Sequence, residues 1–192
     1  MLLRPRLSRG RGSIGRMRWG TVVAVPGLVA LCVACTVGAP AAVEPMAVSG
    51  DPRPPGRAFQ ARVERVVDGD TFIAVRRGER LRVRLIGVDS PETVRPGYPV
   101  ECWGPEASRL LTRTLPVDLR VTAAYQDGGQ RDQYGRELWD VWLPDGTFVQ
   151  AKLVRRGAAE AVAYPPQTEH ADRLDQVEAR ARHDDVGLWG AC

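Results

Sequence analysis

The sequence has very little lysine and histidine. Of its 27 basic residues only Lys152 is a lysine, and its two histidines are His170 and His183. These histidines lie on one predicted helix at a spacing unlike that of zinc ligands, so we expect both to be surface residues. Their scarcity also argues against hydrolytic chemistry that depends on a histidine base. Arginine must therefore supply almost every cationic contact, and arginine binds phosphate through two parallel hydrogen bonds.

Positive charge is also scarce outside the N-terminal segment. The whole chain has a net charge of +4, but six of its arginines lie in residues 1–43, which contain no acidic residue. The remainder carries 21 basic and 23 acidic residues, a net charge of −2. A general electrostatic attraction to polyanions is thus excluded for the chain after residue 43. Any nucleic-acid binding must come from a local arrangement of arginines.

Residues 1–43 have the organisation of an export signal. An arginine-rich start is followed by an apolar stretch with no charged residue between Arg18 and Glu44. Ala39-Pro40-Ala41 then offers a small-residue cleavage pattern. The uncharged stretch is also long enough to span a bilayer. Both a signal peptide and a retained N-terminal membrane anchor therefore stay open.

A lipid anchor is a third form of attachment. Cys35 follows Ala34 as in bacterial lipoproteins, although Cys32 stands where that signal has an aliphatic residue. In each case we expect an exported protein, either secreted or tethered to the outer face of the bacterial cytoplasmic membrane.

The remaining chain divides into a linker and one domain. Residues 44–57 are rich in proline and glycine, which predicts a linker, and residues 58–192 have the size of a single domain. This domain contains two cysteines, Cys102 and Cys192. In an oxidising compartment an even number favours one disulfide bond. Two free buried thiols are the alternative.

The hydrophobic pattern of the domain predicts an α+β fold that is mainly β with helices. Five segments alternate as strands do, and a helical segment separates the third strand from the fourth. This order is typical of a five-stranded OB-fold barrel with three helices. The predicted strands are 61–67, 71–75, 81–88, 117–124 and 137–143, and the predicted helices are 104–115, 148–156 and 167–184.

Two aspartates follow the predicted strands at points that barrel closure would bring to one rim. Asp70 follows an Asp-Gly turn and Asp89 ends the third predicted strand. Carboxylate and backbone carbonyl oxygens are the ligands of hard cations such as Ca²⁺ or Mg²⁺. The carbonyl of Ser90 would add a further ligand.

Three more residues complete this candidate site. Arg84 lies on the polar face of the third strand, where it could clamp a phosphate. Glu92 follows a proline in a rigid loop, where it could accept a proton from water. Arg136 lies at the entry of the fifth strand and could reach the same rim, where it would meet developing negative charge.

The sequence resembles the staphylococcal-type thermonuclease family in several segments that occur in the same order. The resemblance implies an OB-fold barrel with three helices and Ca²⁺-dependent hydrolysis of DNA and RNA to 3′-phosphorylated products. It implies that Asp70, Asp89 and the Ser90 carbonyl bind calcium. Arg84 and Arg136 would clamp the phosphate, and Glu92 would assist the attacking water. The matching segments are 67–71, 84–93, 104–108, 132–136, 153–159 and 187–189.

One departure concerns the aromatic residues that stack on a base. The type enzyme of the family has two spaced tyrosines after its second helix, whereas here Tyr164 is followed by two prolines. Tyr134 is the second candidate for nucleotide binding. Such stacking tolerates any base. We expect a monomer that acts on DNA and RNA and prefers single strands.

Two non-enzymatic functions compete with this interpretation. An OB module that only binds single strands would be expected to have lost part of the site, yet all five charged side chains are present. An exported calcium-binding or adhesion domain would give no reason for arginines beside the site. Both alternatives therefore explain the sequence less well than a nuclease.

Overall fold

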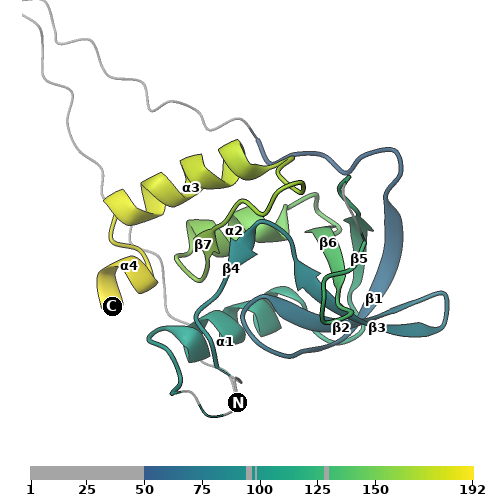
Figure 1. Ribbon diagram of the computed structural model, residues 1–192, viewed down its shortest axis with the longest axis horizontal. Helices are drawn as coiled ribbons and strands as arrows, with labels where there is room; N and C mark the ends of the chain where they lie inside the picture. Colours follow the sequence, from purple (N-terminus) through teal and green to yellow (C-terminus); the bar gives the residue numbers. More distant parts are fainter. Residues whose placement is uncertain (1–49, 94–96, 98, 128–129) are drawn as a thin grey trace, which may run out of the picture. The chain divides into compact units, whose positions relative to one another are not determined.

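The computed structural model describes residues 50–192, apart from 94–96, 98 and 128–129. The predicted leader and the first part of the predicted linker lie outside the described residues. Five strands close into a barrel (Figure 1), which confirms the predicted fold class. In barrel order they are β1 (Phe59–Val66), β2 (Thr71–Arg76), β3 (Glu79–Leu85), β6 (Glu137–Trp142) and β5 (Arg120–Ala124).

The alternating pattern of the strands fills the barrel interior. In β3, Leu81, Val83 and Leu85 are buried, while Arg82 between them is exposed. Because successive side chains of a strand point to opposite faces, the arginines of β3 lie on its outer face. Trp139 of β6 is fully buried in the core.

The parallel contact between β3 and β6 closes the barrel, whereas the other barrel pairs are antiparallel. In this pair Arg84 lies opposite Leu138. The start of β6 therefore lies beside the end of β3. This register brings the loop before β6, with Arg136 at its end, to the rim that carries Arg84.

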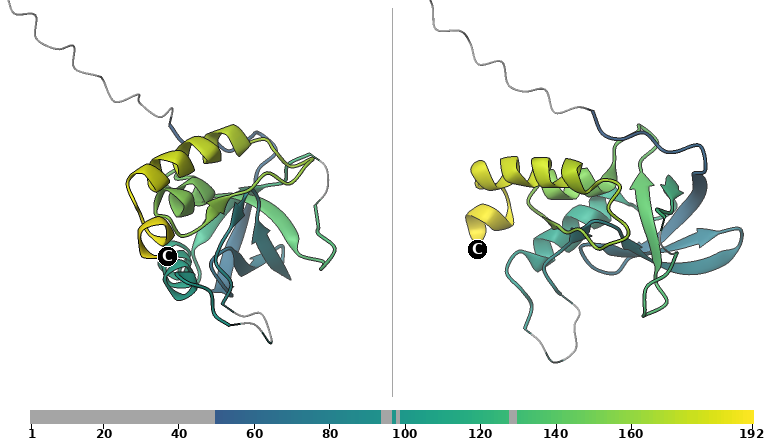
Figure 2. Two further views of the ribbon diagram at one scale, coloured as in Figure 1. Left: turned by 60° about the vertical axis from the view of Figure 1, so that its left-hand side comes forward. Right: turned by 45° about the horizontal axis from the view of Figure 1, so that its top comes forward.

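Helices pack together beside the barrel (Figure 2), and the three predicted ones are present. The second, which follows the barrel strands, packs against the third. A one-turn helix near the C-terminus was not predicted. The helices are α1 (Gly104–Thr114), α2 (Val149–Arg155), α3 (Ala171–His183) and α4 (Leu188–Ala191).

The prediction of one continuous strand over 81–88 was wrong. Gly87 has a positive φ of 77°, which breaks the strand after β3. The chain then forms β4 (Val88–Asp89), which pairs with β7 (Glu160–Ala161) as a separate two-stranded sheet. Asp89 consequently ends its own short strand beside the barrel.

Both ends of the domain are tied down. In the predicted linker, the Asp51 carboxylate accepts hydrogen bonds from Arg155 and Arg173 at 3.0 and 3.3 Å. Cys102 and Cys192 form a disulfide with their Cα atoms 6.0 Å apart. This bond links the C-terminus to the segment before α1. No helix in the described part of the chain combines the length and apolar character needed to cross a membrane.

Candidate active site

A cleft of about 620 Å³ opens at the barrel rim where β3, β4 and the loop before β6 meet. Every residue that the sequence predicts to bind a cation, a phosphate or a nucleotide lines this cleft. Two further lining residues, Asp68 and Arg82, were not among them. The predicted residues that line it are Asp70, Arg84, Asp89, Ser90, Glu92, Tyr134, Arg136 and Tyr164.

The turn between β1 and β2 positions Asp70. Asp68 accepts hydrogen bonds from the backbone N–H of Asp70 at 3.1 Å and of Thr71 at 2.7 Å, which fixes the turn. Gly69 has no side chain, and a Cβ there would lie 2.6 Å from Ser90. Glycine at this position therefore allows the β1–β2 turn and the Ser90 segment to approach each other closely.

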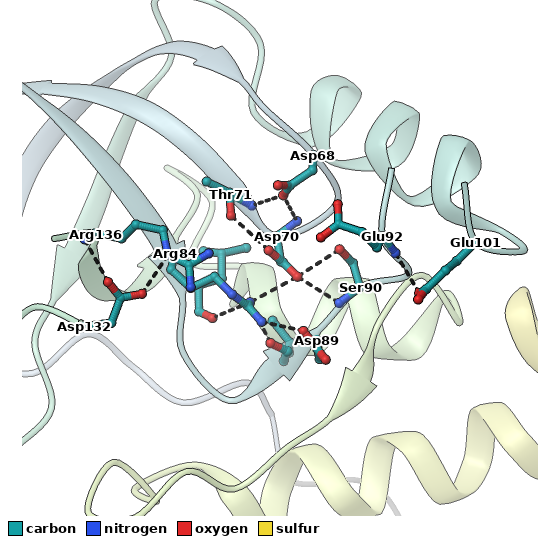
Figure 3. Close-up of polar contacts among 12 residues, drawn as sticks. Asp68, Asp70, Thr71, Arg84, Asp89, Ser90, Glu92, Glu101, Asp132 and Arg136 are labelled. Atoms are coloured by element: carbon teal, nitrogen blue, oxygen red, sulfur yellow. Dashed lines mark hydrogen bonds and ion pairs between the residues drawn. The ribbon is translucent and has the colours of Figure 1, made fainter. Parts of the chain in front are cut away.

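Arg84 bridges the two aspartates (Figure 3). Its Nη1 lies 3.1 Å from Asp70 Oδ2, and its Nη2 donates to Asp89 Oδ1 at 2.6 Å. Asp70 Oδ2 also accepts hydrogen bonds from Ser90 N and Oγ, both at 2.8 Å. Only 11% of the Arg84 side chain is exposed. The guanidinium is thus held in one orientation at the cleft wall.

Negative charge accumulates at this wall. Burial raises the pKa of Asp89, and the charges of Asp70 and Glu160 raise it further, although Arg84 lowers it. Burial and the neighbouring Asp70 raise the pKa of Asp68 to about 6. An added cation favours the charged form of carboxylates whose pKa is raised in this way. The negative charge at this wall and the oxygen ligand atoms together make Asp70, Asp89 and the Ser90 carbonyl a fitting set of ligands for a hard metal ion.

Glu92 lies in the loop that follows β4. Its backbone N–H donates to Glu101 at 2.8 Å, and its carboxylate accepts a hydrogen bond from the N–H of Thr93 at 2.8 Å. The loop packs on the start of α1, where a Cβ on Gly104 would lie 3.1 Å from the Glu92 carbonyl oxygen. Backbone contacts therefore hold the carboxylate at the cleft.

Arg136 reaches the cleft from the start of the β6 segment. Asp132 accepts hydrogen bonds from its backbone N at 2.9 Å and its Nε at 2.6 Å. Among the described residues no bond occupies the terminal nitrogens of its guanidinium, which remain available to a ligand. The guanidinium carbon lies 5.5 Å from the centre of the Tyr134 ring.

The two tyrosines face solvent at the cleft. Tyr134 is 73% exposed and Tyr164 is 52% exposed, so a large part of each aromatic side chain is free to contact a ligand. Both also line an adjoining cavity of about 550 Å³, together with Leu138 and Pro166. This arrangement suits a planar group beside a phosphate.

A second acidic group lies away from the cleft. One potential ligand atom each of Asp140, Glu169 and His170 lies within 4.8 Å of the others, so this cluster could hold a metal ion. His170 is not the surface residue expected from the sequence, because only 13% of its side chain is exposed. His183 is exposed as expected.

The residues missed at the cleft had weak sequence signals. Asp68 belongs to an Asp-Gly pair that indicates only a turn. Arg82 alternates with Arg84 on one face of β3, but strand arginines on an outer face are usually solvent-exposed without a function. Neither signal identifies a cleft residue until the barrel is closed.

Comparison with known proteins gives a consistent result. The family model described as "Staphylococcal nuclease homologue" matches residues 82–191. The thermonuclease of Staphylococcus intermedius is 42% identical over 127 residues, which cover 66% of this chain and 74% of the relative. That of Staphylococcus hyicus is 39% identical over 128 residues, 67% of this chain and 74% of the relative. Endonuclease YncB of Bacillus subtilis is 34% identical over 128 residues, 66% of this chain and 60% of the relative.

Proposed function

This chain belongs to the staphylococcal nuclease homologues, and from that membership we propose that it is a calcium-dependent nuclease that cuts DNA and RNA. The hydrolysis of phosphodiester bonds is the activity of the family's named members. The calcium dependence, the 3′-phosphorylated products and the site of action are the parts that this proposal adds.

The convergence of the two predicted arginines with the three predicted carboxylates around one cleft carries the proposal. Arg84 lies on β3 and Arg136 lies in the loop before β6, yet both line the 620 Å³ cleft. Two guanidinium groups bind a phosphodiester and stabilise the additional negative charge of its transition state. A calcium-binding or adhesion domain has no use for this pair, so hydrolysis explains the geometry better.

The ligand set fits calcium better than a softer metal. Asp70, Asp89 and the Ser90 carbonyl would hold the ion, and neither histidine nor cysteine lines this cleft among the described residues. Bound calcium would offset the negative charge of the phosphate and make a nearby water more acidic. The Asp140 cluster is a poorer candidate for the catalytic ion, because Asp140 is only 2% exposed and does not line the cleft that collects the arginines.

The chain's own residues supply the remaining chemistry. Glu92 accepts a proton from the water that attacks the phosphorus atom. Arg84 and Arg136 hold the phosphate oxygens while the bond to the 5′ oxygen breaks, and the phosphate stays on the 3′ oxygen. The 5′ oxygen then takes up a proton from solvent and leaves as a hydroxyl group, and Glu92 returns its proton to solvent.

The proposal also covers the strandedness of the substrate and the place where the enzyme acts. Tyr134 and Tyr164 would stack on unpaired bases, which favours single-stranded substrates. The leader over residues 1–43 motivates secretion or attachment to the outer face of the cytoplasmic membrane. We expect the enzyme to act as a monomer, because all candidate site residues lie in one chain.

The direct test is digestion of single-stranded DNA and of RNA by the purified protein. We expect cleavage of both in millimolar Ca²⁺, loss of activity with chelator and its recovery when Ca²⁺ is restored. End-group analysis of the fragments should find 3′ phosphates. If both polymers stay intact in Ca²⁺ but still bind, the chain is a binding module instead of an enzyme.

A further inference from the structure

Three arginines alternate along the outer face of β3. Arg80, Arg82 and Arg84 are two residues apart, so their side chains leave the strand on the same side. Arg80 is held by Glu64, whose carboxylate oxygens accept hydrogen bonds from Nε at 2.8 and 2.9 Å. Arg84 is held by Asp70 and Asp89. Each outer arginine of the row thus has its charge compensated by the protein.

Arg82, between them, is different. Its side chain is exposed and lines the cleft with Arg84 and Arg136. No hydrogen bond or ion pair joins it to another residue in the described ranges, whereas Arg136 is paired with Asp132. Arg82 therefore brings an uncompensated positive charge to a cleft whose other walls carry several carboxylates.

The charge lies where a second phosphate of a bound strand would pass. Two residues of a β-strand advance about 6.6 Å, a step comparable to the repeat of an extended sugar–phosphate backbone. Because the domain carries a net charge of −2, nucleic acid must be attracted by such local cations. We propose that Arg82 forms a second phosphate subsite, which binds the phosphate next to the scissile one while Arg84 and Arg136 hold the scissile phosphate.

This inference rests on the proposed nuclease function and deepens it. A dinucleotide with one phosphodiester fills only the Arg84–Arg136 subsite, whereas a longer strand also reaches Arg82. The protein should therefore prefer oligonucleotides over dinucleotides, and Arg82 should account for part of that preference. A phosphate contact carries no information on the base, so the preference should hold equally for DNA and RNA.

The test compares Arg82→Gln with Arg120→Gln. Arg120 is also an exposed strand arginine without a partner among the described residues, but it lies on β5 and does not line the cleft. We would measure kcat/KM in Ca²⁺ for an eight-nucleotide oligothymidylate and for a thymidine dinucleotide. In Arg82→Gln the ratio of octamer to dinucleotide kcat/KM should fall about tenfold, and in Arg120→Gln it should not change.

Salt dependence gives a second readout. With chelator present to prevent cleavage, the slope of log affinity for the octamer against log salt should become shallower by about 0.7 in Arg82→Gln. Arg82→Lys keeps the charge and should retain the wild-type slope. Thermal unfolding of each variant checks that the domain remains folded.

An unchanged octamer-to-dinucleotide ratio in folded Arg82→Gln would overturn the subsite. So would an equal loss for both substrates, because that result assigns Arg82 to the scissile phosphate. Failure of the proposed function appears differently: the wild-type protein would then cleave neither substrate in Ca²⁺. The two failures are therefore distinguishable in one set of measurements.

Discussion

The cleft and a buried polar cluster both contain carboxylates, but they differ in how fully the protein compensates the charge of these groups. The buried cluster consists of Gln126, Asp140, Gln150 and His170. Asp140 is 2% exposed, and its oxygens accept hydrogen bonds from Gln126 at 3.0–3.1 Å and from Gln150 at 3.3 Å. His170 lies 3.4 Å from the same carboxylate. Protein donors therefore surround this carboxylate on several sides.

In the cleft, carboxylates and arginines border open space instead. Asp89 is a half-exposed carboxylate with a raised pKa, and Arg136 keeps terminal nitrogens that no described residue engages. Such incompletely compensated charges weaken a fold unless a ligand compensates them. The comparison indicates that the cleft contributes to activity and that the Asp140 cluster contributes to stability.

The largest effect that tests this division is expected from Arg84→Ala. On the proposed mechanism the substitution would remove a phosphate clamp from the transition state, and kcat should fall about 10³-fold, as for other arginines that stabilise phosphoryl transfer. Steady-state hydrolysis of single-stranded DNA in Ca²⁺ measures the change. Arg80→Ala is the matched control, because Arg80 lies on the same strand face but does not line the cleft.

Wild-type kcat in a folded Arg84→Ala protein would contradict the assignment of the scissile phosphate to this residue. A comparable loss in Arg80→Ala would attribute the effect to the general charge of the β3 face. Either result would contradict the inference that the cleft, and not the general charge of β3, contributes to activity.

The sequence predicts the cleft much better than the buried cluster. Asp70 follows a predicted turn, Arg84 lies on the polar face of the third predicted strand and Asp89 ends that strand, so local pattern and family resemblance place them on one rim. Arg136 is more than forty residues away, but it belongs to the matching segment 132–136. Even so, the positive φ of Gly87 and the separate β4–β7 pair depend on contacts with a distant segment.

The buried cluster could not be predicted from local pattern. Because successive side chains of a strand point to opposite faces, Asp140 should lie on the face opposite Trp139 and contact solvent. It is buried because Gln150 of α2 and His170 before α3 cover this face. Gln126 joins them from the end of β5. These contacts join residues that no motif connects, so they become visible only in the folded chain.

A smaller effect, on stability rather than activity, is expected from Asp140→Ala. It leaves the buried amide donor of Gln126 without an acceptor and removes one of the two acceptors of Gln150 Nε2, which should lower the free energy of unfolding by about 3 kcal/mol. Urea unfolding measures this loss. The kcat of the folded fraction should stay within about twofold of wild type, because Asp140 does not line the cleft.

Asp175→Ala is the control for removal of a carboxylate, because Asp175 is exposed on α3. It should change stability by less than about 0.5 kcal/mol. A large loss of kcat in Asp140→Ala at full stability would show that the cluster acts on the cleft, and the division between the two regions would then be wrong.

The smallest effect concerns the pH dependence of the buried cluster. Burial lowers the pKa of His170, but the hydrogen bond and charge of Asp140 and the charge of Glu169 raise it more, so the pKa lies above its usual value of 6.5. A histidine with a raised pKa in the folded state binds its proton more tightly there than in the unfolded chain. The resulting stabilisation is complete below pH 6.5 and disappears as the pH rises through the folded-state pKa.

Urea unfolding of wild type and His170→Gln at several pH values isolates this contribution. The difference in unfolding free energy between the two proteins should be larger at about pH 5.5 than at about pH 8.5. His183→Gln, which changes an exposed histidine, should show no such trend. A difference that grows with pH would mean that His170 is held neutral by burial, and Asp140 would then be compensated by the two glutamines alone. In that case the buried cluster, like the cleft, would contain a charge that the protein does not fully compensate.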